Sequence, residues 1–236
     1  WIEPVKAEHF DGKTVLDVGC GKGRHVLQAQ KFGASTVVGV DLSHAVDVAF
    51  RNVGRKSGVH IIQADIYHLP LKDLTFDYAY SIGVLHHTPD PAKSFRRMVD
   101  KVKPGGSVSA WVYGREGNWW IIYLLNPVRR ITSVLSVPIT KALSFVLTVI
   151  LQTLLITLYR PATKGPWLKR LLPYSDYLCS ISGYSFRENF CIVLDHLIPE
   201  IAFYIRAEEF RKWFDDAKLR DITITQRYGN SWRGFA

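Results

Sequence analysis

Three glycines and an acid stand close together near the N-terminus, at Asp17, Gly19, Gly21 and Gly23. Glycine lets a backbone turn sharply and approach a ligand closely. A helical pattern begins directly after the last glycine, and free N–H groups at a helix N-terminus favour an anionic group such as a carboxylate. A nicotinamide-type loop would need glycine at position 24, which is arginine here. The segment predicts a cofactor loop of another kind, with a plain strand–turn–helix as the alternative.

Two further acids follow apolar runs that have the character of strands. Asp41 ends the second such run, and one carboxylate can accept hydrogen bonds from both hydroxyls of a ribose. The carboxyl end of a parallel strand would aim it at the ligand crevice. Ser43 offers an N-cap for the next helix, which leaves Asp41 available for a ligand. Asp65 follows the third apolar run.

The pattern Asp-x-Gly-x-Gly-x-Gly at 17–23 resembles motif I of the class I S-adenosylmethionine (SAM) methyltransferases. The resemblance covers about residues 13–113, with Asp41 as motif II, Ser81–His87 as the motif IV region and Lys103–Gly106 as the turn before strand five. It implies SAM as cofactor, held at its amino-acid end by the loop, at its ribose by Asp41, and at its adenine by Asp65 and the next residue's backbone. The implied cofactor-binding residues are Asp17, Gly19, Cys20, Gly21, Gly23, Asp41, Leu42, Asp65, Ile66 and Ser81.

Methyl transfer from a sulfonium needs the acceptor, methyl and sulfur in line, water excluded and, for some acceptors, a proton removed. His86 and His87 follow the fourth apolar run, where the methyl group is expected, and histidine titrates near neutrality. We take both as candidate catalytic bases, with a helix-entry turn as the alternative role for the pair. Weaker candidates for the lining of the same site are Asp195, His196 and Tyr204, and Arg206 is a candidate to meet an acidic group on the substrate. No cluster has metal-ligand spacing, so no metal is expected.

The resemblance is strongest to the small-molecule branch, which includes the ubiquinone and menaquinone methyltransferases. No Asn-Pro-Pro-Tyr or Asp-Pro-Pro-Tyr segment follows strand four, and no cysteine there could attack a pyrimidine. We therefore expect an enzyme acting on a small lipophilic acceptor, quinone- or isoprenoid-like, and no nucleic acid. The net charge of +9 nevertheless favours an anionic partner. The alternatives are a non-catalytic SAM-binding subunit at a membrane, and a fold member that uses SAM for another reaction.

The elements that must position these residues alternate regularly from Thr14 to Tyr113. This alternation is typical of a doubly wound, mostly parallel α/β sheet of Rossmann-like type, with helices on both faces. The expected strands are 14–18, 36–40, 59–63, 76–81 and 107–113, and the expected helices are 24–32, 43–56 and 91–102. A helix over 207–219 and a strand over 221–226 resume the pattern, and 232–236 could supply an edge strand.

After strand five the alternation stops. The segment 117–175 holds seven Lys or Arg residues and no Asp or Glu. Its uncharged run Ala142–Tyr159 lies near the lower limit of about 20 residues for a membrane span, but a single span would separate two ends of one sheet. We expect a re-entrant or surface-lying helical hairpin on an anionic membrane, with a substrate lid or a homodimer interface as alternatives. Aromatic residues that favour membrane interfaces are Trp119, Trp120, Tyr123, Tyr159 and Trp167.

We therefore expect the chain to have three parts. These are a SAM-binding core over 1–116, the helical apolar and basic insertion over 117–200, and a C-terminal helix and strand over 201–236 that complete the core. Cys20, Cys179 and Cys191 lack Cys-x-x-Cys spacing, which favours a reducing cytoplasmic setting, with the protein peripheral on the inner membrane face. The chain begins at Trp1 rather than Met, as after trimming of a leader, and its first residues do not resemble a signal peptide.

Overall fold

The computed structural model describes residues 3–119 and 121–236, so Trp1 and Trp120, both named above, lie outside the described residues. The chain divides into two compact units. The first comprises 1–113, 205–225 and 232–236, and the second comprises 114–204 and 226–231. In this division 226–231 joins the insertion unit, whereas it was expected in the C-terminal part.

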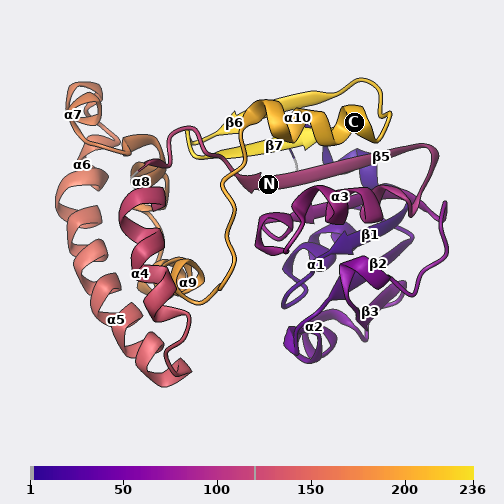
Figure 1. The fold of residues 1–236 in the computed structure, drawn as a ribbon, viewed down its shortest axis with the longest axis horizontal. Coiled ribbons are helices and arrows are strands. Elements are labelled where there is room, and N and C mark those ends of the chain that lie inside the picture. Colours follow the sequence, from indigo (N-terminus) through magenta and orange to yellow (C-terminus); the bar gives the residue numbers. More distant parts are fainter. Residues whose placement is uncertain (1–2, 120) are drawn as a thin grey trace. The chain divides into compact units, whose positions relative to one another are not determined.

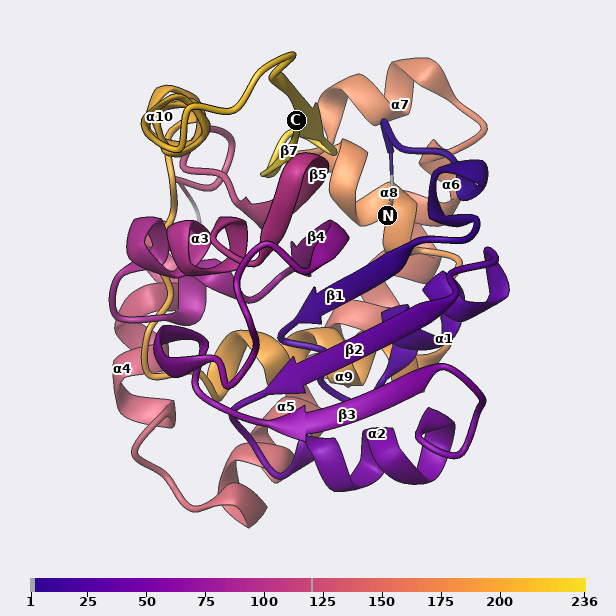
Figure 2. The ribbon, with the colours of Figure 1, turned by 90° about the vertical axis from the view of Figure 1, so that its right-hand side faces the viewer.

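Within the described residues, seven strands form one sheet in the order β3-β2-β1-β4-β5-β7-β6. Their bounds are β1 Thr14–Val18, β2 Thr36–Asp41, β3 Val59–Gln63, β4 Phe76–Ile82, β5 Val102–Tyr113, β6 Thr223–Arg227 and β7 Ser231–Phe235. The first five strands are parallel (Figure 2). Val108 and Ala236 exchange backbone hydrogen bonds, and Gly114 N–H donates to the Asn230 carbonyl, so β7 runs antiparallel to β5. The predicted Rossmann-like fold class is confirmed.

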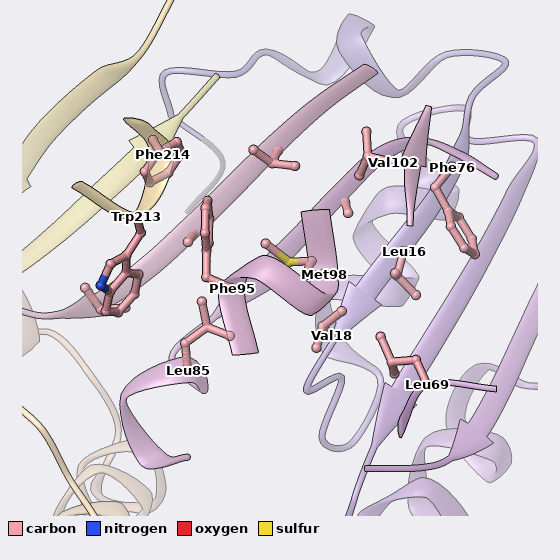
Figure 3. Close-up of a cluster of buried hydrophobic side chains, with 14 of the residues drawn as sticks. Leu16, Val18, Leu69, Phe76, Leu85, Phe95, Met98, Val102, Trp213 and Phe214 are labelled. Atoms are coloured by element: carbon pink, nitrogen blue, oxygen red, sulfur yellow. The ribbon is translucent and has the colours of Figure 1, made fainter. Parts of the chain in front are cut away.

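Helices cover both faces of the sheet because successive strand residues point to opposite sides. Val15 belongs to one buried cluster, with Phe10 and the helices α1 and α2, whereas Leu16 belongs to the other, with α3 and α10. Figure 3 shows the second cluster, where Phe95, Met98 and Phe214 meet the strands. The helices of this unit are η1 Ala7–Phe10, α1 Arg24–Lys31, α2 Ala45–Val53, η2 Ile66–His68, η3 Leu85–His87, α3 Pro91–Val99 and α10 Ala207–Asp216.

The turn expected over Lys103–Gly106 lies inside β5 instead. Phe76 pairs with Val102 and Tyr78 pairs with Ser107, so the four residues between them stand opposite Asp77 alone. A strand can bend in this way without ending, because an irregularity leaves the extra residues unpaired while the ladder resumes beyond them. The expected helix before it is also shorter, since α3 ends at Val99.

The second unit is helical over most of its length. Its helices are η4 Ile121–Leu125, α4 Asn126–Thr132, α5 Val137–Leu154, η5 Leu155–Tyr159, α6 Arg160–Ala162, α7 Pro166–Leu171, α8 Ser175–Ile181 and α9 Phe186–Leu197. Several prolines that interrupt the apolar sequence lie in first turns, as in α5 and α7, where the missing N–H leaves no intrahelical bond unmade. The long helix α5 packs along α9 (Figure 1). Of the described helices, Val137–Ala162 alone is long and apolar enough for a membrane span, with mean hydropathy 2.1.

Candidate active site

A pocket of about 190 Å³ lies at the carboxyl ends of β1 to β4. The strand order reverses between β1 and β4, and ligands of open α/β sheets bind at such a switch point. Six predicted residues line this pocket, namely Gly19, Asp41, Leu42, Asp65, Ile66 and His87. The other lining residues are Val18, Val40, Ala64, Tyr67, Val84, Thr88 and Pro89. The pocket is smaller than the ~300–1,000 Å³ of whole-ligand sites, so it suits one end of a cofactor.

Asp41 ties the glycine loop to the turn after β2. Its Oδ2 accepts from the Gly21 N–H at 2.9 Å, and its Oδ1 accepts from the Ser43 N–H at 2.9 Å and the Ser43 hydroxyl at 2.7 Å. The carboxylate is thereby fixed in orientation at the pocket edge. The neighbouring Leu42 side chain is 69% exposed, which presents an aliphatic surface for a flat ring. Ser43 therefore braces Asp41 as well as accepting from the Ala45 N–H at the start of α2.

Asp65 occupies the matching position after β3. Its Oδ1 accepts from the Tyr67 N–H at 2.9 Å and so caps the short helix η2, while Oδ2 lies 3.5 Å from Nδ1 of His68. Sequence reasoning missed Tyr67, which also lines the pocket. Its hydroxyl donates to the Asp90 carbonyl and accepts from the Asp90 N–H at 2.8 Å, so the ring is held on both sides of its oxygen. The sequence feature that could have indicated Tyr67 is its position, because it is an aromatic residue two positions after the acid that follows a strand.

The three loop glycines all have positive φ, at 82°, 50° and 81°, but they differ in their surroundings. A Cβ at Gly19 would lie 2.3 Å from a Val84 methyl, and one at Gly23 would lie 2.8 Å from a Val53 methyl. A Cβ at Gly21 would meet nothing within 4 Å. Gly19 and Gly23 thus serve close packing, whereas Gly21 borders open space.

The loop's own N–H groups are largely used within the chain. Gly19 and Cys20 both donate to the Val40 carbonyl, Gly21 donates to Asp41 and Gly23 donates to the Cys20 carbonyl. The expectation that loop N–H groups bind an anion is therefore met only in part, because these four have acceptors already. Shape and open space at Gly21 are what the loop offers a ligand.

Three predicted cofactor residues lie behind the pocket rather than in its lining. Asp17 is fully buried, its Oδ2 accepts from the Tyr80 hydroxyl at 3.2 Å, and its Oδ1 has no hydrogen-bond partner among the described residues. Burial raises the pKa of Asp17 to about 8. Ser81 donates to the Val18 carbonyl at 2.8 Å and so joins β4 to β1. Burial also raises the pKa of the Cys20 thiol.

The structure places the two candidate histidines in different surroundings. Both belong to η3, but His87 lines the pocket whereas His86 is fully buried. The His86 ring lies 4.1 Å from the Tyr113 ring and 6.2 Å from that of Trp111. The His87 ring meets Tyr113 edge-on at 5.6 Å. His87 is therefore the better placed base, and His86 packs beneath it.

The structure does not place the four weaker candidates in the lining of this pocket. Asp195, His196 and Tyr204 belong to the second unit, and Arg206 to the first. Arg129, which is buried, donates to the His196 carbonyl at 2.7 Å and to the Tyr204 hydroxyl at 3.1 Å. Among the described residues no group of three or more His, Cys, Asp or Glu is placed to hold a metal ion.

The geometry fits a nucleoside with a charged tail. A braced carboxylate at Asp41 and a second one at Asp65 suit ribose hydroxyls and an amino-substituted ring. The open space at Gly21 leaves room beside the loop, and the unpartnered Oδ1 of Asp17 lies behind it.

Comparison with known proteins identifies the group to which this arrangement is similar. Residues 16–110 match the model of the family described as Methyltransferase domain. The tRNA U34 carboxymethyltransferase of Nautilia profundicola is 30% identical over 139 residues, which are 57% of this chain and 46% of that protein. A protein of the same name from a Shewanella species is 39% identical over 103 residues, 42% of this chain and 31% of that protein. The chain thus matches less than half the length of these relatives.

A solved structure shares the fold over nearly the whole chain. It is that of a SAM dependent methyltransferase from Aquifex aeolicus, which is 16% identical and covers 96% of this chain and 82% of its own, with a TM-score of 0.51. The family match over 16–110 supports the predicted class I SAM-dependent methyltransferase domain with SAM as its cofactor, and the Aquifex structure confirms its fold. The quinone-type branch is not supported. The non-catalytic alternative is not favoured either, because the relatives are named as enzymes.

The expected exclusion of nucleic acid, together with the small lipophilic acceptor, was wrong. The relatives are named for tRNA, which is a nucleic acid. The sequence test behind the exclusion was too narrow in chemical terms. Absence of an Asn-Pro-Pro-Tyr segment and of a cysteine nucleophile excludes two ways of methylating a base, and it leaves other nucleic-acid acceptors open.

Proposed function

We propose that this chain, whose residues 16–110 form a class I SAM-dependent methyltransferase domain, transfers a methyl group to an acceptor that enters beside His87. The observation that carries this proposal is the meeting of Gly19, Asp41, Asp65 and His87 in one pocket at the switch point of the sheet. When bound, SAM supplies an activated methyl group on a sulfonium sulfur. The protein would then hold the cofactor, align it with the acceptor and exclude water.

Cofactor recognition rests on the two strand-end carboxylates. Asp41 would hold the ribose hydroxyls, and its three hydrogen bonds within the chain keep it in place before the cofactor arrives. Asp65 would accept from the adenine amino group, with Leu42 and Ile66 against the ring. Asp17 supports the loop from behind, where its buried carboxyl bonds Tyr80.

His87 is the residue we propose to take a proton from the acceptor. It lines the pocket, and its ring is steadied by the edge-on contact with Tyr113. Val84 and Pro89 line the same pocket and would help to exclude water. A general base of this kind typically contributes about 10²–10⁴-fold to the rate.

For the acceptor, tRNA is the class with specific support. Two relatives are named as tRNA-modifying enzymes, and the net charge of +9 suits a polyanion. The test incubates the full chain with methyl-labelled SAM and total tRNA, a total lipid extract, or neither. Label in the tRNA fraction is expected from the wild type, and its loss in His87→Ala with unchanged SAM affinity would support the assigned base. Label in the lipid fraction, or SAM binding without transfer to either, would contradict the proposed acceptor.

A further inference from the structure

The long helix α5 has its polarity reversed relative to an ordinary surface helix, which buries its apolar face and exposes its polar one. Its buried positions are Thr140, Ser144 and Thr148, at 2%, 0% and 0% exposure. These residues recur every four positions and so form one face of the helix. The rest of its surface carries large apolar side chains that are about half exposed, namely Phe145, Val146, Val149, Ile150 and Leu154, and Leu158 of the following η5 is similarly exposed.

The buried polar face is explained by packing within the second unit. Gln152 continues the same face, and its Oε1 accepts from the Asn189 side chain of α9 at 2.7 Å. Small hydroxyl residues let two helices approach closely. On the exposed apolar face, the Phe145 ring lies 5.3 Å from the Phe186 ring of α9, but both side chains stay exposed, so packing within the unit does not cover this face.

The Ser and Thr hydroxyl groups of this helix and of η5 have hydrogen-bond acceptors within the protein. On the buried face, Ser144 and Thr148 donate to carbonyls four residues earlier, at 2.7 and 2.6 Å. On the exposed face, Thr153 and Thr157 do the same, at 2.9 and 2.8 Å. A side chain that bonds its own helix can face hydrocarbon without leaving a polar group unsatisfied.

Within the segment 117–175, which contains α5, the charged residues all have one sign, whereas α9, which packs along α5, carries Glu188 and Asp195. Lys141 is exposed near its start and Arg160 just beyond η5, with Lys164 and Arg170 exposed further on, and the segment 117–175 contains no acid. Such a cationic border complements anionic headgroups, and it would repel a second copy of itself. Trp167 is 69% exposed and adds an aromatic residue of the kind enriched at membrane interfaces.

We infer that the exposed apolar face of α5 docks on an anionic lipid surface, with the helix lying in the plane of the interface. The face enters the boundary between headgroups and acyl chains, and the basic side chains at its ends contact lipid phosphates. A crossing by this helix alone is inconsistent with the sheet, because β5 before the helix and β7 after it are hydrogen-bonded partners. This inference goes beyond the proposed function, since it assigns a location to the protein and not an acceptor.

The test is co-sedimentation of the full chain with vesicles of phosphatidylcholine and phosphatidylglycerol, compared with phosphatidylcholine alone. The variant Val146→Asp/Ile150→Asp places two charges one turn apart on the exposed face. We expect its partition onto anionic vesicles to fall at least about tenfold, because two apolar side chains no longer enter the interface. The matched control is Phe50→Asp/Leu74→Asp, two residues of the first unit that are 51% and 58% exposed, and it should bind as the wild type does.

SAM binding and the thermal unfolding curve of each variant establish that it is folded, and Val146→Asn/Ile150→Asn replaces the aspartates if they disturb the helix. Wild type that stays in the supernatant at low salt, or a face variant that sediments like the wild type, would overturn the inference. Two other results would also overturn it. One is that the wild type forms a dimer without lipid whereas the face variant is monomeric. The other is that the wild type binds tRNA and the face variant does not, while the face variant still binds vesicles.

Discussion

At the scale of single residues, the buried carboxyl of Asp17 makes the stability of the fold depend on pH. Complete burial, together with the charge of Asp41, raises its pKa to about 8, against 3.8 for an ordinary aspartate. The folded state therefore retains a proton that the unfolded state loses above about pH 4. Between these values the folded state binds more protons than the unfolded state, so stability decreases as the pH rises.

This sign gives a measurable prediction for Asp17→Asn. Asparagine stays neutral and can still accept from the Tyr80 hydroxyl, so the variant should lose the decline in unfolding free energy between pH 4 and 8. The wild-type slope from this group is at most about 1.4 kcal/mol per pH unit. Urea unfolding of both proteins across this range measures it, and parallel curves would show that Asp17 is already ionised in the fold.

Asp41 is the residue on which cofactor affinity should depend most. Its replacement by alanine removes a charged acceptor for the ribose and also releases the Gly21 N–H and Ser43. We expect Asp41→Ala to weaken SAM binding by about 1.5–3 kcal/mol, measured by calorimetry. Asp47→Ala, on the exposed surface of α2 nearby, is the control. Unchanged affinity in Asp41→Ala would remove this residue from the site.

Replacing His86 and replacing His87 should have different effects on the protein. His87→Ala is expected to lower turnover about 10²-fold or more while SAM affinity is kept, because the side chain lines the pocket. His86→Ala should instead lower the melting temperature, since a buried ring packed on Tyr113 is lost. Equal and full activity in both variants would place the base elsewhere or indicate an acceptor that needs none.

At the scale of elements, the glycine loop shows that neighbouring glycines are required for different reasons. Gly21→Val adds a side chain where the structure has open space, although its φ of 50° strains a β-branched residue, so we expect a folded protein of somewhat lower stability whose SAM binding is lost. Gly19→Val meets the Val84 side chain and should destabilise the fold itself. Thermal unfolding and calorimetry on both variants distinguish these outcomes. A Gly21→Val protein that binds SAM normally would show that the loop does not face the cofactor.

Many of the strands and the residues at their ends could be predicted from the sequence, because the patterns that indicate them are local. The bounds of β1 and β3 follow from apolar runs bordered by turn residues, and the pocket residues Asp41 and Asp65 follow from acids placed at strand ends. Position within the layers was not predictable. Asp17 and Ser81 belong to the same motifs, but only the packed sheet shows that they lie behind the pocket. The same holds for His86 and His87, whose surroundings differ although they are adjacent in the chain. Likewise, the continuation of β5 through Lys103–Gly106 depends on pairing with a distant strand.

At the scale of the whole molecule, the positive charge gives a prediction for the proposed tRNA acceptor. If tRNA binds through its phosphates, its affinity should fall steeply as sodium chloride rises, with log K linear in log salt. Filter binding between about 50 and 200 mM salt measures this slope. SAM affinity serves as the control, because it rests on a pocket inside the first unit and should change little. No retention of tRNA even at the lowest salt would contradict the acceptor.

The reciprocal hydrogen bonds between Val108 and Ala236 also have a consequence for biosynthesis. The edge of β5 that pairs with β7 stays open until β7 has been made, and the whole helical insertion is made in the interval. A nascent chain therefore presents an unpaired strand edge and the apolar face of α5 together, before the fold can close. Early contact of α5 with a lipid surface or a chaperone would shield one of these two surfaces during synthesis, and the order of folding would then run from the insertion to the completed sheet.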